Sequence, residues 1–195
     1  MSDSEPMCLK RRAFDLAAGG IAVSLIVPEA AAQGGQTGVR VDLAVYPEKR
    51  IGKLTALTDD VPVAFTYPLE GQPNLLFKLG TEALRGIGPQ KDVVAFSALC
   101  THMGGSLMGR YRRDVKALGP CPFHFSVFDL RKGGMPVHAS ATQNLPQVLL
   151  RLDGDDIVAV GMIGLIYGQH SNLADGRLAP GTTPGRTDAP RIMRG

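Results

Sequence analysis

The chain has 195 residues, of which 44% are hydrophobic and 20% charged, a balance that suits one globular domain with an apolar core. The formal net charge of +3 is small and spread along the chain, which argues against nucleic-acid binding. With 24 Gly, 14 Pro and no Trp, the composition favours turns and short strands over long helices.

The first 32 residues predict an export signal. Lys10-Arg11-Arg12-Ala13-Phe14 precedes an apolar run from Leu16 to Val27, and Ala30-Ala31-Ala32 offers a cleavage site. The paired arginines resemble a twin-arginine signal, a route used by proteins that fold before export, and predict a periplasmic location. A chance Arg-Arg pair would leave the cleavage site unexplained. The run is broken by glycines and is too short for a firm membrane anchor.

Residues 33–170 predict one all-β domain. Apolar residues alternate or form short runs bounded by Gly and Pro, which indicates about eight to ten short strands in an antiparallel sandwich or barrel. Asp153-Gly154 marks a hairpin between two of them. The strand-like segments are 39–45, 61–67, 75–79, 93–96, 125–130, 147–152, 157–160 and 163–167.

Residues 171–195 form a polar tail rich in Gly and Pro. Such a composition predicts a flexible terminus, with an arm ordered against a partner subunit as the alternative.

Two short motifs combine Cys with His. Cys100-Thr101-His102 and Cys121-Pro122-Phe123-His124 each offer one thiol and one imidazole. This C-x-H and C-x-x-H pair is typical of a Rieske 2Fe–2S centre, in which two His replace two Cys on one iron. Cys100 and Cys121 would bind one iron, and His102 and His124 the other. The third cysteine, Cys8, lies in the predicted signal.

Two other interpretations of the cysteines remain. A disulfide would not need the histidines. A structural zinc-binding interaction module could use the same four ligands, although zinc sites favour C-x2-4-C pairs before the histidines. The remaining histidines, His138 and His170, have no Cys or carboxylate at ligand spacing and are expected to be ordinary surface residues. We find no catalytic triad, phosphate loop or dinucleotide motif, and predict no catalytic residue in this chain.

Residues beside the ligands fit the same chemistry. Gly104-Gly105 allows the backbone to approach a cluster closely. Ser126 is placed to donate a hydrogen bond to a cluster sulfur, which would raise the reduction potential.

The flanking sequence resembles the Rieske small subunit of arsenite oxidase over residues 39–172. The segments that carry this resemblance, besides the two ligand motifs, are Phe65–Pro68, Gly86–Pro89 with Asp92–Ser97, His124–Asp129, Ala141–Pro146 and Leu165–Gly168.

The resemblance implies a Rieske-type antiparallel β-fold with a small cluster-binding subdomain formed by two loops. It implies a large molybdopterin subunit, carrying a further iron–sulfur cluster, that oxidises arsenite. This chain would pass its electrons to a c-type cytochrome or a blue copper protein. A related molybdoenzyme of opposite direction, such as iodate reductase, is the alternative. The Rieske subunit of a quinol:cytochrome complex is disfavoured by the weak anchor and by Phe128.

The chain departs from many Rieske proteins in two respects. Gly105 and Phe123 stand where those proteins have a disulfide that clamps the loops, so we expect loops held mainly by the metal. Phe128 stands where quinol-oxidising Rieske proteins have a Tyr, which removes one hydrogen bond and predicts a lower potential.

Overall fold

The computed structural model describes residues 45–173 and 176–185, and these ranges fold as an all-β protein. Two short 3-10 helices, η2 (Leu54–Ala56) and η3 (Leu130–Lys132), interrupt the strands. No helix in the described part of the chain is long and apolar enough to cross a membrane. The strands are β1 (Glu48–Lys53), β2 (Val63–Thr66), β3 (Pro73–Lys78), β4 (Val93–Ser97), β5 (Tyr111–Arg112), β6 (Ala117–Leu118), β7 (Val127–Asp129), β8 (Met135–His138), β9 (Gln147–Asp153), β10 (Asp156–Ile163) and β11 (Thr182–Thr183).

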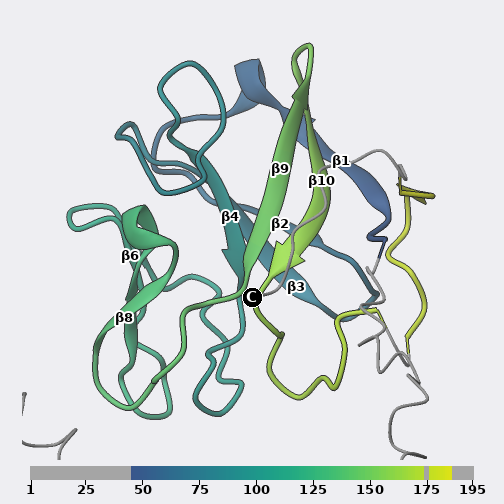
Figure 1. The fold of residues 1–195 in the computed structure, drawn as a ribbon. Helices are drawn as coiled ribbons and strands as arrows, with labels where there is room; N and C mark the ends of the chain where they lie inside the picture. The colour runs from purple at the N-terminus through teal and green to yellow at the C-terminus, as the bar shows by residue number, and fades with distance from the viewer. Residues whose placement is uncertain (1–44, 174–175, 186–195) are drawn as a thin grey trace, which may run out of the picture. The chain divides into compact units, whose positions relative to one another are not determined.

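The strands form two antiparallel sheets. The larger sheet has the order β11-β1-β10-β9-β4-β3-β2, and the smaller sheet has the order β5-β6-β7-β8. Figure 1 shows the larger sheet, with β9 and β10 towards the viewer, beside the smaller sheet that carries β6 and β8. The chain enters the smaller sheet after β4 and returns to the larger one at β9. The smaller sheet is therefore an insertion into the larger one.

Two apolar cores meet at β4, because every residue of this strand is buried. Val94 and Phe96 belong to a first core that also contains residues of the smaller sheet. Val93 and Ala95 belong to a second core with residues of β9 and β10. This division follows the two-residue period of a strand, which sends successive side chains to opposite faces. β4 thus fixes the larger sheet to the smaller one.

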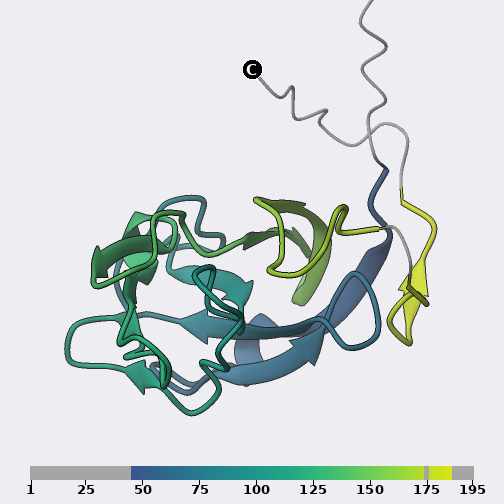
Figure 2. The ribbon, with the colours of Figure 1, turned by 90° about the horizontal axis from the view of Figure 1, so that it is seen from below.

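The larger sheet curls into a half-barrel around the second core. Lys49 Nζ donates to Thr66 O at 2.9 Å and so links β1 to β2, the strand at the far end of the sheet. The described part of the predicted tail contributes to this closure, because β11 pairs with β1 and Ala179 N donates to Pro68 O. Figure 2 shows β11 in yellow beside β1 in blue. A flexible terminus was therefore the wrong expectation for residues 176–185.

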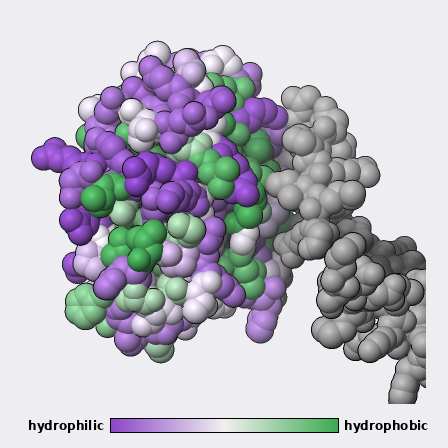
Figure 3. All heavy atoms as spheres, turned by 60° about the vertical axis from the view of Figure 1, so that its left-hand side comes forward, coloured by the Kyte–Doolittle hydropathy of each residue, from purple (hydrophilic) through white to green (hydrophobic). Residues whose placement is uncertain are grey.

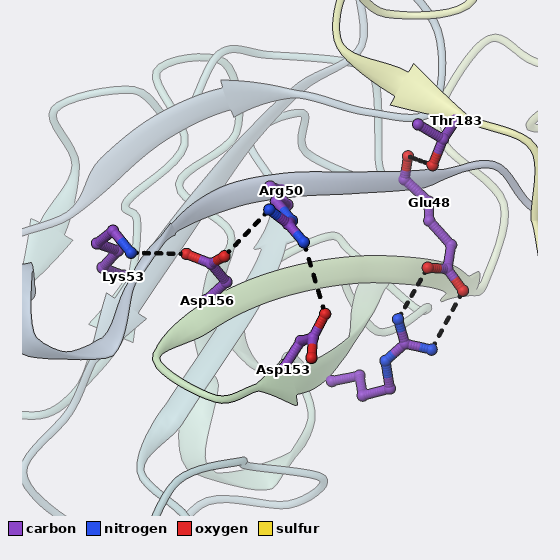
Figure 4. Close-up of polar contacts among 7 residues, drawn as sticks. Glu48, Arg50, Lys53, Asp153, Asp156 and Thr183 are labelled. Carbon is purple, nitrogen blue, oxygen red and sulfur yellow. Dashed lines mark hydrogen bonds and ion pairs between the residues drawn. The ribbon is translucent and has the colours of Figure 1, made fainter.

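Ion pairs cover the outer face of β1, β10 and β9. Glu48 accepts two hydrogen bonds from the guanidinium of Arg151, and Arg50 lies 3.3 Å from Asp156 and 3.6 Å from Asp153 (Figure 4). Solvent-exposed pairs of this kind contribute about 0–1 kcal/mol each. The exposed pairs of Arg50 therefore add little to the stability of the fold.

Six of the eight predicted strands are confirmed, at β2, β3, β4, β7, β9 and β10. The strand predicted at 163–167 is wrong, because β10 ends at Ile163 and Gly164 has a positive φ of 87°. The strand predicted at 39–45 lies outside the described residues, apart from Val45, which is not in a strand. The predicted signal, residues 1–32, also lies outside them.

A polar contact fastens the half-barrel to the smaller sheet. Lys116 Nζ and Tyr111 Oη both donate to the carboxylate of Asp60, at 2.6–2.7 Å for Lys116 and 2.6 Å for Tyr111. Burial raises the pKa of Asp60, but the hydrogen bonds from Lys116 and Tyr111 outweigh it, and the pKa is lowered. The folded state therefore holds Asp60 as a carboxylate.

We predict that Asp60→Asn lowers the free energy of unfolding at pH 7 by about 1.5–3 kcal/mol, the typical value of hydrogen bonds to a charged group. A lowered carboxyl pKa stabilises the fold above the unfolded value of about 3.9 and loses this effect as pH falls through the folded pKa. The difference between variant and wild type, measured by urea unfolding, should therefore narrow below about pH 4.

Glu82→Gln is the matched control, because Glu82 pairs with Lys91 at 3.4 Å and both side chains are exposed. Glu82→Gln should lower the free energy of unfolding by less than about 1 kcal/mol. Equal effects of the two substitutions at pH 7 would contradict the role given to Asp60.

Candidate metal centre

The first ligand loop, Cys100–Gly105, follows β4 directly. Cys100 N donates to Gly105 O at 2.9 Å, and Gly104 N donates back to Cys100 O at 2.8 Å. Gly104 has a φ of 69°, which glycine adopts at little cost. Just outside the loop, Leu107 N donates to Ala98 O, so the segments on either side of the loop also stay paired. Loop 1 is thus a tight turn that begins just after β4.

The second ligand loop, Cys121–Ser126, lies between β6 and β7 and repeats the same backbone pattern. Cys121 N donates to Ser126 O at 2.9 Å, and Phe125 N donates to Cys121 O at 3.0 Å. Phe125 occupies the position equivalent to Gly104 and has nearly the same φ, 60°. For a residue with a Cβ this conformation costs about 1–2 kcal/mol. Loop 2 therefore carries strain that a glycine would avoid.

The four predicted ligands come together as two pairs. His102 Nδ1 and His124 Nδ1 lie 3.1 Å apart, and their rings meet edge to face with centroids 4.6 Å apart. Two nitrogens at this distance can bind one metal ion, since a metal–imidazole bond is about 2 Å long. Cys100 and Cys121 are free thiols, both buried in the first core. The imidazoles thus lie on the outside and the thiols on the inside.

The thiol pair is suited to a metal and not to reactive chemistry. Burial raises the pKa of the Cys100 thiol, and the neighbouring Cys121 thiol raises it further, although backbone N–H groups of His102 and Met103 lower it. Without a metal, Cys100 is therefore protonated at neutral pH. A bound metal would replace the proton and hold the sulfur as a thiolate.

The four donors divide into a thiol pair and an imidazole pair. A tetrahedral zinc site needs four donors around one ion. A two-iron cluster needs one pair of donors at each iron, with the two irons bridged by sulfide. The donor set and its division fit a 2Fe–2S cluster.

A third segment, residues 139–146, holds both loops. Thr101 Oγ1 of loop 1 donates to Gln143 O at 2.9 Å. Ala141 N donates to Ser126 Oγ of loop 2 at 3.1 Å. The sequence did not identify this role, because the first bond is made by a backbone carbonyl and the second by a backbone amide. Segment 139–146 is a brace that the protein supplies independently of the metal.

Phe123 fills the space between the two loops. A Cβ added to Gly105 would lie 3.1 Å from Phe123 Cδ2 and only 2.6 Å from Cys121 Sγ. Any side chain at Gly105 would therefore displace the Cys121 sulfur or the Phe123 ring. The two loops are therefore joined by packing of the Phe123 ring on Gly105, and not by a disulfide.

The two predicted tuning residues lie close to the thiols. Ser126 is fully buried, and because its oxygen accepts from Ala141 N, the hydroxyl hydrogen is free to be donated elsewhere. Phe128 is fully buried in the same core as Cys100 and Cys121. Both remaining histidines, His138 and His170, are exposed.

Taken together, the fold and the paired donors define an iron–sulfur electron carrier. Residues 42–149 match the model of the Rieske [2Fe-2S] domain. The chain belongs to the Rieske [2Fe-2S] family, and the cofactor of this site is a 2Fe–2S cluster.

The chain is similar to iodate reductase subunit IdrB of Denitromonas iodatirespirans, with 48% identity over 170 residues that cover 87% of this chain and 90% of the relative. It is 45% identical over 166 residues to the protein of the same name from Pseudomonas sp. (strain SCT), covering 85% of each chain. Among solved structures, the soluble domain of Rieske protein II from Sulfolobus acidocaldarius superposes with a TM-score of 0.57. It shares 22% identity and covers 71% of this chain and 89% of that one, which confirms the predicted Rieske-type fold.

We predict opposite shifts of the reduction potential for changes at Ser126 and Phe128. Ser126→Ala removes the hydroxyl that would donate to a cluster sulfur and should lower the potential. Phe128→Tyr adds a hydroxyl in the core that holds both thiols and should raise it. Voltammetry of the isolated holoprotein measures both shifts. An unchanged potential in either variant would contradict the cause assigned to that residue.

Proposed function

We propose that this chain is the electron-transfer subunit of an iodate reductase. As a Rieske protein it carries electrons within a redox enzyme, and its curated relatives are subunits of iodate reductase. Identity of 48% extends over 87% of the chain, well beyond the ligand motifs. The relatives thus favour the iodate alternative, whereas arsenite oxidase rests only on the resemblance of the flanking segments.

The exposed imidazole edges are the observation that carries the electron-transfer role. Next to them in the chain are three exposed apolar side chains, Met103 at 51%, Phe123 at 57% and Phe125 at 62% exposed area. Figure 3 shows apolar patches among polar surface on the side of the molecule that carries the smaller sheet. We define Met103, Phe123 and Phe125 as the rim. An apolar rim around a redox centre suits a partner that excludes water when it docks.

The chain's own groups determine how electrons enter and leave. The cluster, when bound, takes up and releases one electron at a time. Cys100 and Cys121 hold its inner side within the core, and His102 and His124 hold its outer side at the rim. Electrons would come from a c-type cytochrome or blue copper protein and pass to a large molybdopterin subunit, where iodate is reduced. The reverse flow would serve arsenite oxidation.

The compartment is part of the proposal. Twin-arginine export through residues 1–32 would deliver a folded, cluster-loaded protein to the periplasm, where such donors are found.

The test uses the purified complex with its large subunit and follows the electron paramagnetic resonance signal of the reduced cluster. After stoichiometric reduction, iodate should abolish the signal, and arsenite added to oxidised complex should not generate it. The isolated chain with iodate is the control and should keep its signal. Generation of the signal by arsenite, with no response to iodate, would overturn the proposal in favour of arsenite oxidase.

The rim gives a second prediction, at Phe125. Phe125→Gly relieves positive-φ strain of about 1–2 kcal/mol, partly offset by the greater chain entropy of glycine, about 0.5–1 kcal/mol. The isolated chain should therefore unfold with unchanged or slightly higher free energy. Its affinity for the large subunit should fall about tenfold or more, as expected when a buried aromatic anchor is lost.

Val61→Ala is the matched control, because Val61 is also exposed, at 52%, and lies outside the rim. Its affinity should equal that of wild type. Calorimetric titration with the large subunit measures both values. Unchanged binding of the Phe125→Gly protein would exclude Phe125 from the interface.

A further inference from the structure

Residues 164–172, which follow β10, form a strap that crosses from the half-barrel to loop 1. Ile166 is buried in the second core and anchors the strap. Asn172, also buried, accepts from Ile166 N at 2.9 Å and donates to Gly164 O at 2.8 Å. The strap is therefore fixed at both ends by its own hydrogen bonds.

Tyr167 projects from this strap onto the turn of loop 1. A Cβ added to Gly104 would lie 2.5 Å from Tyr167 Cδ1 and 2.7 Å from Tyr167 Cε1. The edge of the Tyr167 ring thus rests directly on the Gly104 backbone, two residues after His102. The Tyr167 atoms nearest to this position are all carbons of the ring.

Loop 1 needs such a contact more than loop 2 does. The brace reaches loop 2 through a buried hydrogen bond, from Ala141 N to Ser126 Oγ. It reaches loop 1 only through the exposed bond from Thr101 to Gln143 O, where water competes. The far end of loop 1, at Gly104, is covered by Tyr167 instead.

We propose that Tyr167 is a positioning residue for the 2Fe–2S cluster: its ring fixes the Gly104 turn and, through it, the orientation of His102. On loop 1, this contact provides part of the restraint that a disulfide provides in many other Rieske proteins. This role rests on the Rieske assignment alone. It is tested on the isolated holoprotein, so its failure is distinguishable from failure of the iodate proposal.

Removal of the ring should release the cluster. Tyr167→Ala should lose its visible absorption in the presence of an iron chelator about tenfold faster than wild type. Tyr167→Phe retains the ring and should stay within about twofold. The reduced-cluster resonance spectrum should broaden in the Ala protein, since His102 would adopt several orientations, and sharpen again in the Phe protein. The apo forms of all three should unfold at the same temperature, since Tyr167 is a half-exposed surface residue.

A double-mutant cycle tests the contact itself. Gly104→Ala alone adds a methyl group that meets the Tyr167 ring, and should accelerate cluster loss. In the Tyr167→Ala protein the added methyl group has space. Gly104→Ala should therefore accelerate cluster loss less there than in wild type, and the effects of the two substitutions on the rate should not be additive. Additive effects, an unaltered spectrum in Tyr167→Ala, equal damage in Tyr167→Phe, or a less stable Tyr167→Ala apoprotein would each overturn the proposal.

Discussion

The structure depends on one core that is shared by two sheets and by the ligand thiols. Phe96 of β4 and Phe128 of β7 lie in this core together with Cys100 and Cys121. Each loop therefore begins at a position fixed by buried aromatic packing, and the sulfurs need no further device to point inward. Because the backbone of each loop folds back on its own cysteine, the histidine that follows is directed away from the core. Burial of thiols and exposure of imidazoles thus have a single cause.

Loops of this kind must stay paired when no disulfide joins them, and the protein uses several weak restraints in place of one strong one. Phe123 packs on Gly105, segment 139–146 bonds to both loops, and Tyr167 covers Gly104. The expectation that the loops are held mainly by the metal therefore left out three protein contacts. All three are noncovalent, and the bond from Thr101 to Gln143 and the Tyr167 contact lie near the surface, so these two are open to change by a docked partner. A disulfide would have made the same loops insensitive to their surroundings.

The features that could be predicted from the sequence are those that depend on residues close together in the chain. The ligand motifs and the apolar run of β4 need no knowledge of distant residues. β1 was missed because its exposed side chains are charged, and it forms a strand through pairing with β10 and β11 and ion pairs such as Glu48 with Arg151. β11 was missed for a similar reason: its two threonines pair with a strand far away in sequence. The brace and the strap act through backbone groups or ring packing, which residue identities do not reveal.

The two loops have the same backbone conformation at Gly104 and Phe125 but different side chains there, and this difference bears on function. Gly104 and Phe125 share a positive φ, but Gly104 is covered by the Tyr167 ring whereas Phe125 is 62% exposed. Phe125 keeps a large, mostly exposed side chain in a conformation that favours glycine. Neither burial nor backbone geometry in the isolated chain compensates for that strain. Under the proposed docking, a contact made outside this chain would compensate for it, with loop 2 on the docking side and loop 1, held by Tyr167, on the side that keeps the cluster in place.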